Sequence, residues 1–477
     1  IATQASRQSY VDMPSGSSVE WNMKTTGAGV TVRFTLADGN NGMGIDSSFD
    51  VYVNGQKKKT VNISSYNMWQ YFPYGNPSDT GDASSTPTGF AFDEVHFALD
   101  TPLKSGDRIA IKSNGGQAFG VDFIEVENIP AEIEQPDGAI SVTDFGASPN
   151  DGKDDLYAFK RAIDAASKSS SKKLYIPSGQ WDLSGLWDIY GDGVTIIGAG
   201  IWYTNLMFTN YKDFGGGICG GNPSTEHHRK YDGSAVGDDD CNRMDISNFH
   251  MDSRLRSRYN QMAVYKAFMD NFGESTVLHD LWIDHFECGV WVGDYNGNIG
   301  TANNLKIINC RIRNVLADGV NFCIGTTNSV VYNCNIRNTG DDGLAIWNDY
   351  GANKDESGNI FAYNTIDFTW RAGGIGIYGG KDLKVYNNYI CDMSMAAGIH
   401  LNTEFKGYKF DNTTEMIIEN NYLVRCGTVS DSWNRDLAAI DFYEEVKNVT
   451  FKNNEIYDSP FIAIKAGERN PTNIKFE

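Results

Sequence analysis

Residues 1 to about 130 alternate between apolar and polar positions with a period of two. The segment SVEWNM places Val19, Trp21 and Met23 on one face, and GVTVRF, FDVYVNG and RIAIKS repeat the alternation. This period is typical of half-buried strands and predicts an antiparallel β-sandwich over residues 1–130. The segment IPAEIEQPDG carries two prolines and three acidic residues. We therefore interpret residues 131–138 as a linker between two domains.

A helical period follows the linker. Leu156, Phe159, Ile163 and Ala166 fall on one face of a short predicted helix, and a strand-like segment, KKLYIPSGQWDL, comes directly after it. The first coil of a solenoid would otherwise expose unpaired backbone groups. The helix is therefore predicted to cap the open end of such a solenoid.

The remainder of the chain repeats a strand with a central asparagine. The copies are KIINCRI, VVYNCNI, FAYNTI, KVYNNYI, IIENNYL and TFKNNEI. Their first asparagines stand at positions 309, 333, 364, 387, 420 and 453. The intervals of 24, 31, 23, 33 and 33 indicate a base repeat of about 23 with insertions of 8 to 10. This pattern predicts a right-handed parallel β-helix over residues 139–477, with the insertions at one corner.

A second strand follows each asparagine strand, in the segments GVWVG, GVNFC, GLAIW, GIGIY, GIHLN and AIDFY. We align them by their first Gly or Ala, so that the apolar residues point inward and the middle residue points outward. The outward column is then Trp291, Asn321, Ala345, Gly376, His400 and Asp441. A column of small, polar and aromatic residues on one parallel sheet predicts the floor of a groove.

The same alignment brings three aspartates together. Gly319 aligns with Gly343, so Asp318 stacks on Asp342 one coil away, about 4.8 Å distant, with Asp341 beside them. Converging carboxylates repel one another and raise at least one pKa. One protonated and one ionised carboxyl suit glycoside hydrolysis with inversion. We expect Asp318 and Asp342 to hold the water and Asp341 to donate the proton; the alternative is that these aspartates only cap turns.

The formal net charge of −21 changes the range of partners. It disfavours nucleic acid, anionic membranes and polyanionic substrates, so we expect a neutral partner. No apolar run approaches the ~20 residues of a membrane span. The sequence has neither an initiator Met nor a signal peptide, and we expect a processed or excised piece.

Cys219 and Cys241 flank one loop and are candidates for a disulfide, whereas the other six cysteines lie in strand-like stretches typical of buried thiols.

These motifs resemble a known family. DFGA, NDGKDD and IPSG are similar to the opening of pectate-lyase-like β-helix proteins, and the pair ADG and DDG resembles polygalacturonases. The fuller resemblance, over essentially the whole chain, is to glycoside hydrolase family 87, the bacterial α-1,3-glucanases or mutanases, including mycodextranases. It implies a carbohydrate-binding-module-like β-sandwich before the β-helix, and inverting endo-hydrolysis of α-1,3-glucan by Asp318, Asp341 and Asp342. The sequence departs from polygalacturonases in lacking an evident Arg and Lys pair for a uronate carboxylate.

Several further residues are candidates for binding sugar, because aromatic faces stack on sugar rings and polar groups bond hydroxyls. The predicted substrate-binding residues are Trp291, Asp294, Asn321, Trp347, Asn348, Tyr378, His400 and Asp441. Trp370, Trp433 and Asp349 are additional candidates, although each could equally cover the core or be solvated.

The predicted β-sandwich contains one candidate calcium ligand. GVDFIEV resembles the last strand of carbohydrate-binding modules that carry a structural calcium, and Asp122 matches its acidic position. The glutamates that such modules supply near their N-terminus are not obvious here. The chemistry itself needs no cofactor.

We therefore expect an all-β, secreted bacterial glycoside hydrolase that acts as a monomer on a neutral polysaccharide, without nucleic acid or membrane partners. Alternatives remain open: hydrolysis of another neutral α-glucan such as nigeran or dextran, a uronate lyase on the same fold, or a carbohydrate-binding β-helix without catalysis.

Overall fold

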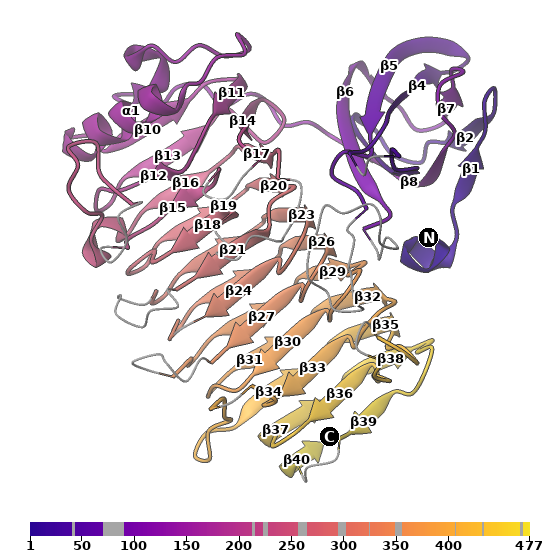
Figure 1. Cartoon of the computed structure of the whole chain (residues 1–477), viewed down its shortest axis with the longest axis vertical. Helices are drawn as coiled ribbons and strands as arrows, with labels where there is room; N and C mark the ends of the chain where they lie inside the picture. Colours follow the sequence, from indigo (N-terminus) through magenta and orange to yellow (C-terminus); the bar gives the residue numbers. More distant parts are fainter. Residues whose placement is uncertain are drawn as a thin grey trace. The chain divides into compact units, whose positions relative to one another are not determined.

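The computed structural model divides the chain into two compact units, Ile1–Ala131 and Glu132–Glu477 (Figure 1). It describes residues 1–40, 43–69, 90–211, 215–222, 228–255, 265–293, 302–323, 325–348, 355–405, 407–431, 434–467 and 471–477. Within these ranges no helix has the length and apolar character needed to span a membrane. The all-β fold class predicted from the sequence is confirmed, since the elements are nearly all strands.

The N-terminal unit is a sandwich of two antiparallel sheets. Their strand orders are β1-β8-β3-β6 and β2-β7-β4-β5. The strands are β1 (Val11–Met13), β2 (Ser18–Asn22), β3 (Gly27–Leu36), β4 (Asp46–Val53), β5 (Gln56–Ser64), β6 (Asp93–Leu103), β7 (Arg108–Ser113) and β8 (Phe119–Glu127). Apolar side chains from both sheets, such as Val30, Val32, Phe49 and Ile111, fill the space between them. The predicted alternation therefore builds this core.

Asp122 on β8 has an environment that does not fit the expected calcium. Its carboxylate forms an ion pair with Arg33, both side chains being fully buried, and it accepts hydrogen bonds from the backbone N–H of Ser6 (3.0 Å) and from its hydroxyl (2.6 Å). A guanidinium would repel a calcium ion at the same oxygens. The structure therefore gives Asp122 a role in an internal ion pair that ties the first residues of the chain to β3 and β8.

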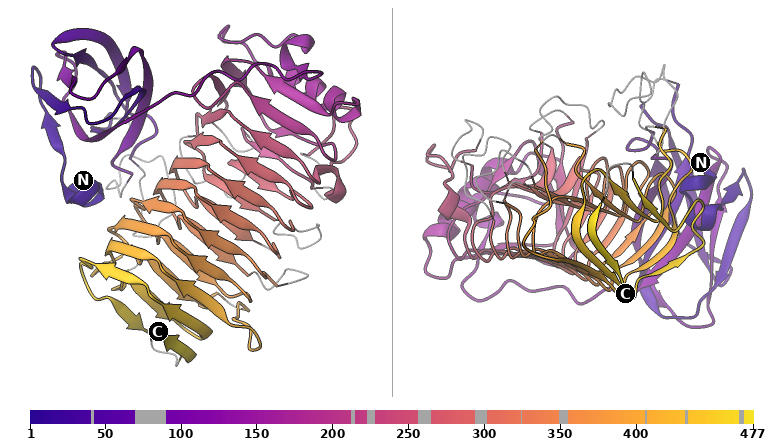
Figure 2. Two further views of the ribbon diagram at one scale, coloured as in Figure 1. Left: turned by 180° about the vertical axis from the view of Figure 1, so that it is seen from behind. Right: turned by 90° about the horizontal axis from the view of Figure 1, so that it is seen from below.

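The C-terminal unit is a parallel β-helix closed at one end by helix α1 (Leu156–Lys168) (Figures 1 and 2). Phe159, Ala162, Ile163 and Ala166 of α1 are fully buried. The helix contacts the first strands of the unit, β9, β10 and β12. The apolar face read from the sequence is therefore the face that covers the first coil.

Each complete coil contributes one strand to each of three parallel sheets. Sheet I contains β9 (Ile140–Ser141), β10 (Lys173–Ile176), β13 (Thr195–Gly198), β16 (Asp245–Ser247), β19 (Val277–His279), β22 (Lys306–Ile308), β25 (Val330–Tyr332), β28 (Ile360–Ala362), β31 (Lys384–Tyr386), β34 (Met416–Glu419), β37 (Lys447–Lys452) and β40 (Thr472–Phe476). Sheet II contains β11 (Gly179–Leu183), β14 (Thr204–Phe208), β17 (His250–Ser253), β20 (Trp282–Asp284), β23 (Arg311–Val315), β26 (Asn335–Thr339), β29 (Thr365–Asp367), β32 (Tyr389–Met393), β35 (Tyr422–Cys426) and β38 (Glu455–Tyr457). Sheet III contains β12 (Trp187–Asp188), β15 (Ile218–Cys219), β18 (Lys266–Asp270), β21 (Cys288–Val292), β24 (Val320–Cys323), β27 (Leu344–Trp347), β30 (Ile375–Tyr378), β33 (Ile399–Asn402), β36 (Ile440–Tyr443) and β39 (Ile464–Ala466).

The register predicted for sheet III is confirmed. Trp291 pairs with Asn321, and the pairing continues through Ala345, Gly376, His400 and Asp441. The residues on either side of this column, among them those at 320, 344, 375 and 399, are fully buried. Because side chains alternate along a strand, the column points away from the core.

The asparagine alignment is wrong by one residue in one coil. Tyr332, Ala362 and Tyr386 are register partners, so Tyr363, not Asn364, follows Ala362 at the turn between sheets I and II. Tyr363 has φ +58°, like the asparagines at this turn, whose φ values are +53° at Asn333 and +56° at Asn387. Asn favours this left-handed conformation, and a Tyr held there hid the repeat. The turn also divides each asparagine strand into two, such as β22 and β23.

The corrected intervals also place the insertions. With Tyr363 counted in place of Asn364, the intervals between successive turn residues become 24, 30, 24, 33 and 33, so that the base repeat is 24. The insertion in the coil of β27 lies between sheets III and I, and the one after β35 lies between sheets II and III. The expectation of a single corner is therefore wrong.

A ladder of buried asparagine side chains runs along the turn between sheets I and II. From Nδ2, Asn364 donates to Oδ1 of Asn388 (3.0 Å), Asn388 to that of Asn421 (2.9 Å) and Asn421 to that of the half-buried Asn454 (2.9 Å). Each also donates to a backbone carbonyl of the preceding coil, as Asn388 does to Phe361 at 3.0 Å. Backbone groups that the tight turn leaves without ladder partners are satisfied in this way.

All eight cysteines are buried and free. The expected disulfide between Cys219 and Cys241 does not form, and the Sγ of Cys241 instead donates to the carbonyl of Ile189 at 3.2 Å. The prediction of buried thiols for the other six is confirmed.

We expect the asparagine ladder to contribute a large share of the stability of the C-terminal unit. Asn388→Ala should lower the free energy of unfolding by about 2–5 kcal/mol, because more than one buried polar group loses its partner. Asn387→Gly is the matched control, since Gly keeps the positive φ of the turn and should change little. Urea unfolding of both variants measures the difference, and equal stabilities would contradict the role of the ladder.

Candidate active site

The turns between sheets II and III bring the three predicted aspartates into one cluster. The N–H of Gly319 donates to the carbonyl of Asp342 at 3.0 Å, which stacks the turn before β24 on the turn before β27. A Cβ on Gly319 would clash with the carbonyl of Gly343. The glycines of ADG and DDG are therefore required by the close approach of two backbones, and they fix the positions of the aspartates before them.

The carboxylates converge closely. One oxygen of each of Asp318, Asp341 and Asp342 lies within 4.8 Å of the others. Asp318 and Asp342 are 6% and 3% exposed, whereas the side chain of Asp341 is 22% exposed. Two of the three carboxylates therefore lie against the β-helix, and Asp341 lies nearest to solvent.

Asp342 is buried, and two hydrogen bonds hold its carboxylate. Its Oδ1 accepts a hydrogen bond from the N–H of Gly373 (2.9 Å), and its Oδ2 accepts one from the hydroxyl of Tyr378 (2.8 Å). Both bonds favour the ionised form, but burial and the neighbouring charge of Asp341 outweigh them and raise the pKa of Asp342 to about 7. The site therefore holds a proton at mildly acidic pH.

Asp341 differs from Asp342 in having a cationic partner. Arg371, from the next turn along the β-helix, forms an ion pair with Asp341, and its side chain is 5% exposed. Asp342, whose pKa is raised, is the more deeply buried of the two adjacent residues.

The outward column of sheet III supports these carboxylates. Asn321 is 4% exposed, and its Nδ2 donates to Oδ2 of Asp318 at 3.0 Å. A side chain on Gly376 would clash with the carboxylate of Asp342. The column therefore combines one amide that orients an aspartate with one glycine that leaves room for another.

A cavity of about 390 Å³ opens over Asp341, Asp342 and His400. It is lined by Asp341, Asp342, Arg371, Ala372, Gly373, Tyr378, Ala396, His400, Glu404, Phe405, Asp431, Arg435, Leu437 and Tyr443. His400 is 6% exposed, and burial lowers its pKa to about 3, so the imidazole is neutral at ordinary pH. A neutral imidazole can donate to, or accept from, a hydroxyl group.

Aromatic rings form a continuous cluster beside Asp318, Asp341 and Asp342, which we call the triad. The ring of Trp347 lies 5.6 Å from that of Trp291 and 5.7 Å from that of Phe405. Phe405 in turn lies 5.5 Å from Tyr378. The structure thus places three of the predicted aromatic residues, Trp291, Trp347 and Tyr378, in one cluster with Phe405 next to the carboxylates.

Other predicted residues have structural partners instead. Asn348 is 3% exposed and accepts the N–H of Glu356 at 2.8 Å. Asp441 is 2% exposed and accepts the N–H of Ala438 at 3.1 Å. Trp370, 2% exposed, packs on Gly340 behind the aspartate turn. Three candidates, Asp294, Asp349 and Trp433, lie outside the described residues.

Much of the cavity wall was not predicted. Glu404, Phe405, Asp431, Arg435 and Leu437 come from the irregular segments after β33 and β35. These segments lie outside the repeat, so no periodic pattern marks them. Their one visible signal is the lengthening of the interval between coils to 33 residues, which shows where insertions stand.

A second acidic cluster lies several coils toward α1. Asp188, Cys219 and His228 are all buried and have donor atoms close enough for a metal. However, the ring nitrogens of His228 face Asp188 (2.9 Å) and Asp270 (3.3 Å), and Lys160 lies 3.6 Å from Asp188. Two carboxylates facing two basic side chains balance their charges without a metal ion.

The comparisons with known proteins agree with this geometry. The family model of the α-1,3-glucanase catalytic domain D1 matches residues 1–129, and that of domain D2 matches residues 242–476. A comparison with curated protein sequences gave no match.

Solved structures extend the likeness to the whole chain. The Agl-KA catalytic domain is 44% identical, with a TM-score of 0.91, and the match covers 100% of this chain and 82% of the other. A family 87 α-1,3-glucanase from Streptomyces thermodiastaticus strain HF3-3 is 25% identical, with a TM-score of 0.82, covering 100% and 81% of the two chains. A family 87 α-1,3-glucanase domain in complex with nigerose, 21% identical over 100% and 82% of the two chains, shares the fold with a TM-score of 0.79.

These matches define a glycoside hydrolase built on a parallel β-helix. More narrowly, the chain belongs to the α-1,3-glucanases of glycoside hydrolase family 87.

The raised pKa of Asp342 makes a prediction about stability. The pKa of Asp342 in the folded protein, about 7, exceeds the ordinary value of 3.8. The stability that its protonated carboxyl contributes is therefore fully present below about pH 4 and is lost as the pH rises through 7. Asp342→Asn cannot ionise. Its free energy of unfolding, relative to that of the unchanged protein, should therefore increase between pH 4 and pH 8. Urea unfolding across this range measures the difference, and a difference independent of pH would contradict the assignment.

Proposed function

We propose that the chain cleaves internal α-1,3 linkages of glucan with inversion, and that Asp318, Asp341 and Asp342 are its catalytic residues. The observation that carries the proposal is the convergence of three carboxylates, from two stacked coils, beside one cavity of a family 87 chain. The related structures that contain nigerose or tetrasaccharides support a glucan as the substrate.

The aspartate intervals give independent support. Family 87 α-1,3-glucanases have been solved as aspartate-to-alanine variants at three positions, which follow one another at intervals of 23 and 1. Asp318, Asp341 and Asp342 follow one another at the same intervals. The positions varied in those proteins thus have the spacing that the stacked turns require here.

The three carboxylates include the acid and base groups that inversion needs. Inverting hydrolysis needs one carboxyl that protonates the leaving oxygen and a second that activates water on the opposite face of the sugar. The pair Asp341 and Asp342 holds a proton below about pH 7, and we propose that this pair supplies the acid. Asp318, with whichever member of the pair is ionised, activates the water.

Two observations bear on which aspartate delivers the proton. Asp341 is the more exposed, at 22%, and so can approach a glycosidic oxygen of a polymer lying over the site. Asp342 has the raised pKa. The first observation favours Asp341 as the donor and the second favours Asp342.

Charge pairing in the cavity supports a neutral substrate. Arg371 pairs with Asp341, and Arg435 pairs with Asp431 (3.0 Å) and Glu404 (3.2 Å). Each guanidinium in the wall is therefore already neutralised by a carboxylate. A uronate lyase would need positive charge directed at the substrate carboxylate, so this arrangement favours glucan over polygalacturonate.

We expect Asp318→Asn, Asp341→Asn and Asp342→Asn each to keep the fold and to lose on the order of 10³-fold in turnover of α-1,3-glucan, because each removes an acid or base group. Reducing ends released from insoluble α-1,3-glucan measure the loss. Dextran, nigeran and polygalacturonate serve as comparison substrates. Binding of the glucan without release of reducing ends by the unchanged protein would overturn the proposal.

An activated substrate identifies the proton donor. Fluoride leaves without needing a proton, so an α-1,3-linked oligosaccharyl fluoride should still be hydrolysed by a variant that lacks only the acid. Retained turnover by Asp341→Asn marks Asp341 as the donor, and retained turnover by Asp342→Asn marks Asp342. Loss of turnover in both variants would show that the acid does not belong to the pair.

The stereochemistry is a separate prediction. Proton NMR at early times of glucan hydrolysis should show the β-anomer first, because water attacks from the face opposite the leaving group. First appearance of the α-anomer would mean retention. An enzyme that cleaves α-1,3-glucan with retention would keep the proposed substrate but lose the proposed mechanism.

A further inference from the structure

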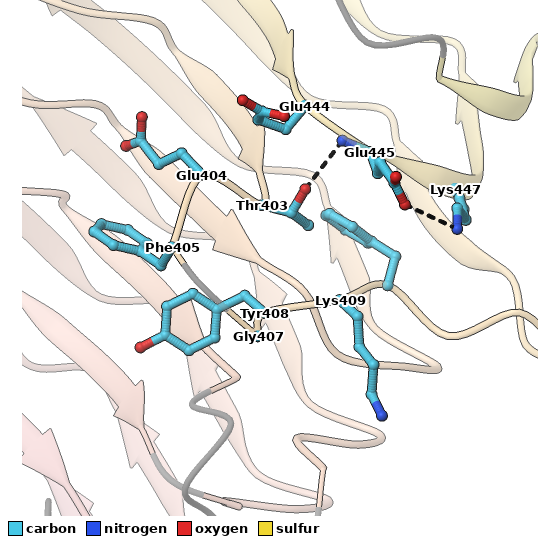
Figure 3. A pocket seen from close by; sticks show the side chains of 10 residues that line it. Thr403, Glu404, Phe405, Gly407, Tyr408, Lys409, Glu444, Glu445 and Lys447 are labelled. Carbon is cyan, nitrogen blue, oxygen red and sulfur yellow. Dashed lines mark hydrogen bonds and ion pairs between the residues drawn. The ribbon is translucent and has the colours of Figure 1, made fainter.

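A second cavity, of about 360 Å³, lies beside the catalytic one. It is lined by Thr403, Glu404, Phe405, Gly407, Tyr408, Lys409, Phe410, Glu444, Glu445 and Lys447. Figure 3 shows the rings of Phe405 and Tyr408 on one side and Glu444, Glu445 and Lys447 on the other. The wall comes from the segments that follow β33 and β36 on sheet III.

The two cavities share a boundary. Glu404 and Phe405 line both of them. Phe405 is 41% exposed, although its ring contacts those of Tyr378 (5.5 Å) and Tyr408 (5.3 Å). Since Tyr378 donates to Asp342, a single row of rings leads from the triad to the second cavity.

The walls of the second cavity are held by the β-helix. The hydroxyl of Thr403 accepts the N–H of Glu445 at 3.0 Å, which joins the two segments (Figure 3). The N–H of Glu404 donates to Oδ1 of Asn402, a fully buried residue paired with Tyr443 on the next coil. These contacts give the cavity a fixed shape, as a pre-formed binding site requires.

The lining chemistry fits an uncharged sugar. Ring faces suit the apolar C–H face of a pyranose, and carboxylates and ammonium groups bond its hydroxyls. Glu445 pairs with Lys447 at 3.2 Å within this wall, and Glu404 pairs at 3.2 Å with Arg435 of the catalytic cavity, so both carboxylates have a positive partner. A surface of this kind offers hydrogen bonds without favouring an anionic or a cationic ligand.

We infer that the second cavity is a distant glucose subsite, which binds the same polymer that is cleaved at the triad. The inference rests on the proposed function, because a glucan with its scissile bond at Asp341 and Asp342 must continue past the catalytic cavity. Phe405 and Glu404 lie where the chain would cross from one cavity into the other. The subsite is filled by long substrates alone, so it determines the preference for chain length.

A cysteine label tests the inference. Glu445→Cys keeps the backbone hydrogen bond to Thr403 and removes only an exposed ion pair, which contributes little to stability. The eight native cysteines are buried, so a bulky maleimide should modify the introduced thiol selectively. Lys384→Cys, on an exposed position of β31 in sheet I, is the matched control.

The labelled Glu445→Cys protein should show a KM about tenfold higher for a long α-1,3-linked gluco-oligosaccharide. Its KM for the shortest oligosaccharide that the unlabelled protein cleaves should not change, and the labelled control should match the unchanged protein on both. Equal effects on the two substrates, or none, would overturn the subsite. Failure of the unlabelled protein to cleave any α-1,3-linked substrate would instead overturn the proposed function.

Discussion

The hydrogen bonds between successive coils are the constraint on which the rest of this protein depends. Parallel strands lie about 4.8 Å apart, so residues one repeat apart in sequence become neighbours in space. Asp318 and Asp342 are 24 positions apart and meet because the N–H of Gly319 donates to the carbonyl of Asp342. Three carboxylates are thus brought together by backbone bonds that do not depend on side-chain charge, and burial together with the neighbouring charge of Asp341 raises the pKa of Asp342.

The electrostatics of the site follow from this fixed arrangement. Burial favours a neutral carboxyl at Asp342, whereas Asp341 is more exposed and pairs with Arg371 from the next turn. Two aspartates adjacent in sequence thereby obtain different surroundings, one paired with a cation and one buried against Tyr378 and Gly373. Acid and base chemistry at one pH requires such a difference between groups of the same type.

The sequence predicted the features that depend on the repeat. The Gly alignment of sheet III was correct because a side chain at Gly319 or Gly376 would clash with the adjacent coil or carboxylate. The asparagine alignment failed at Tyr363, where another residue type adopts the same left-handed turn. The wall residues Glu404 and Arg435 could not be predicted, because their positions follow from how irregular segments after β33 and β35 fold over sheet III.

The place of the insertions has an evolutionary consequence. A coil of 24 residues is complete by itself, and extra residues enter the chain at turns, where they leave the strand register unchanged. Segments such as the one after β33 can therefore gain or lose residues between relatives without moving the aspartates. Selection can thus alter which sugar chains are bound while the reaction stays the same, which makes this fold a scaffold that separates the evolution of specificity from the evolution of chemistry.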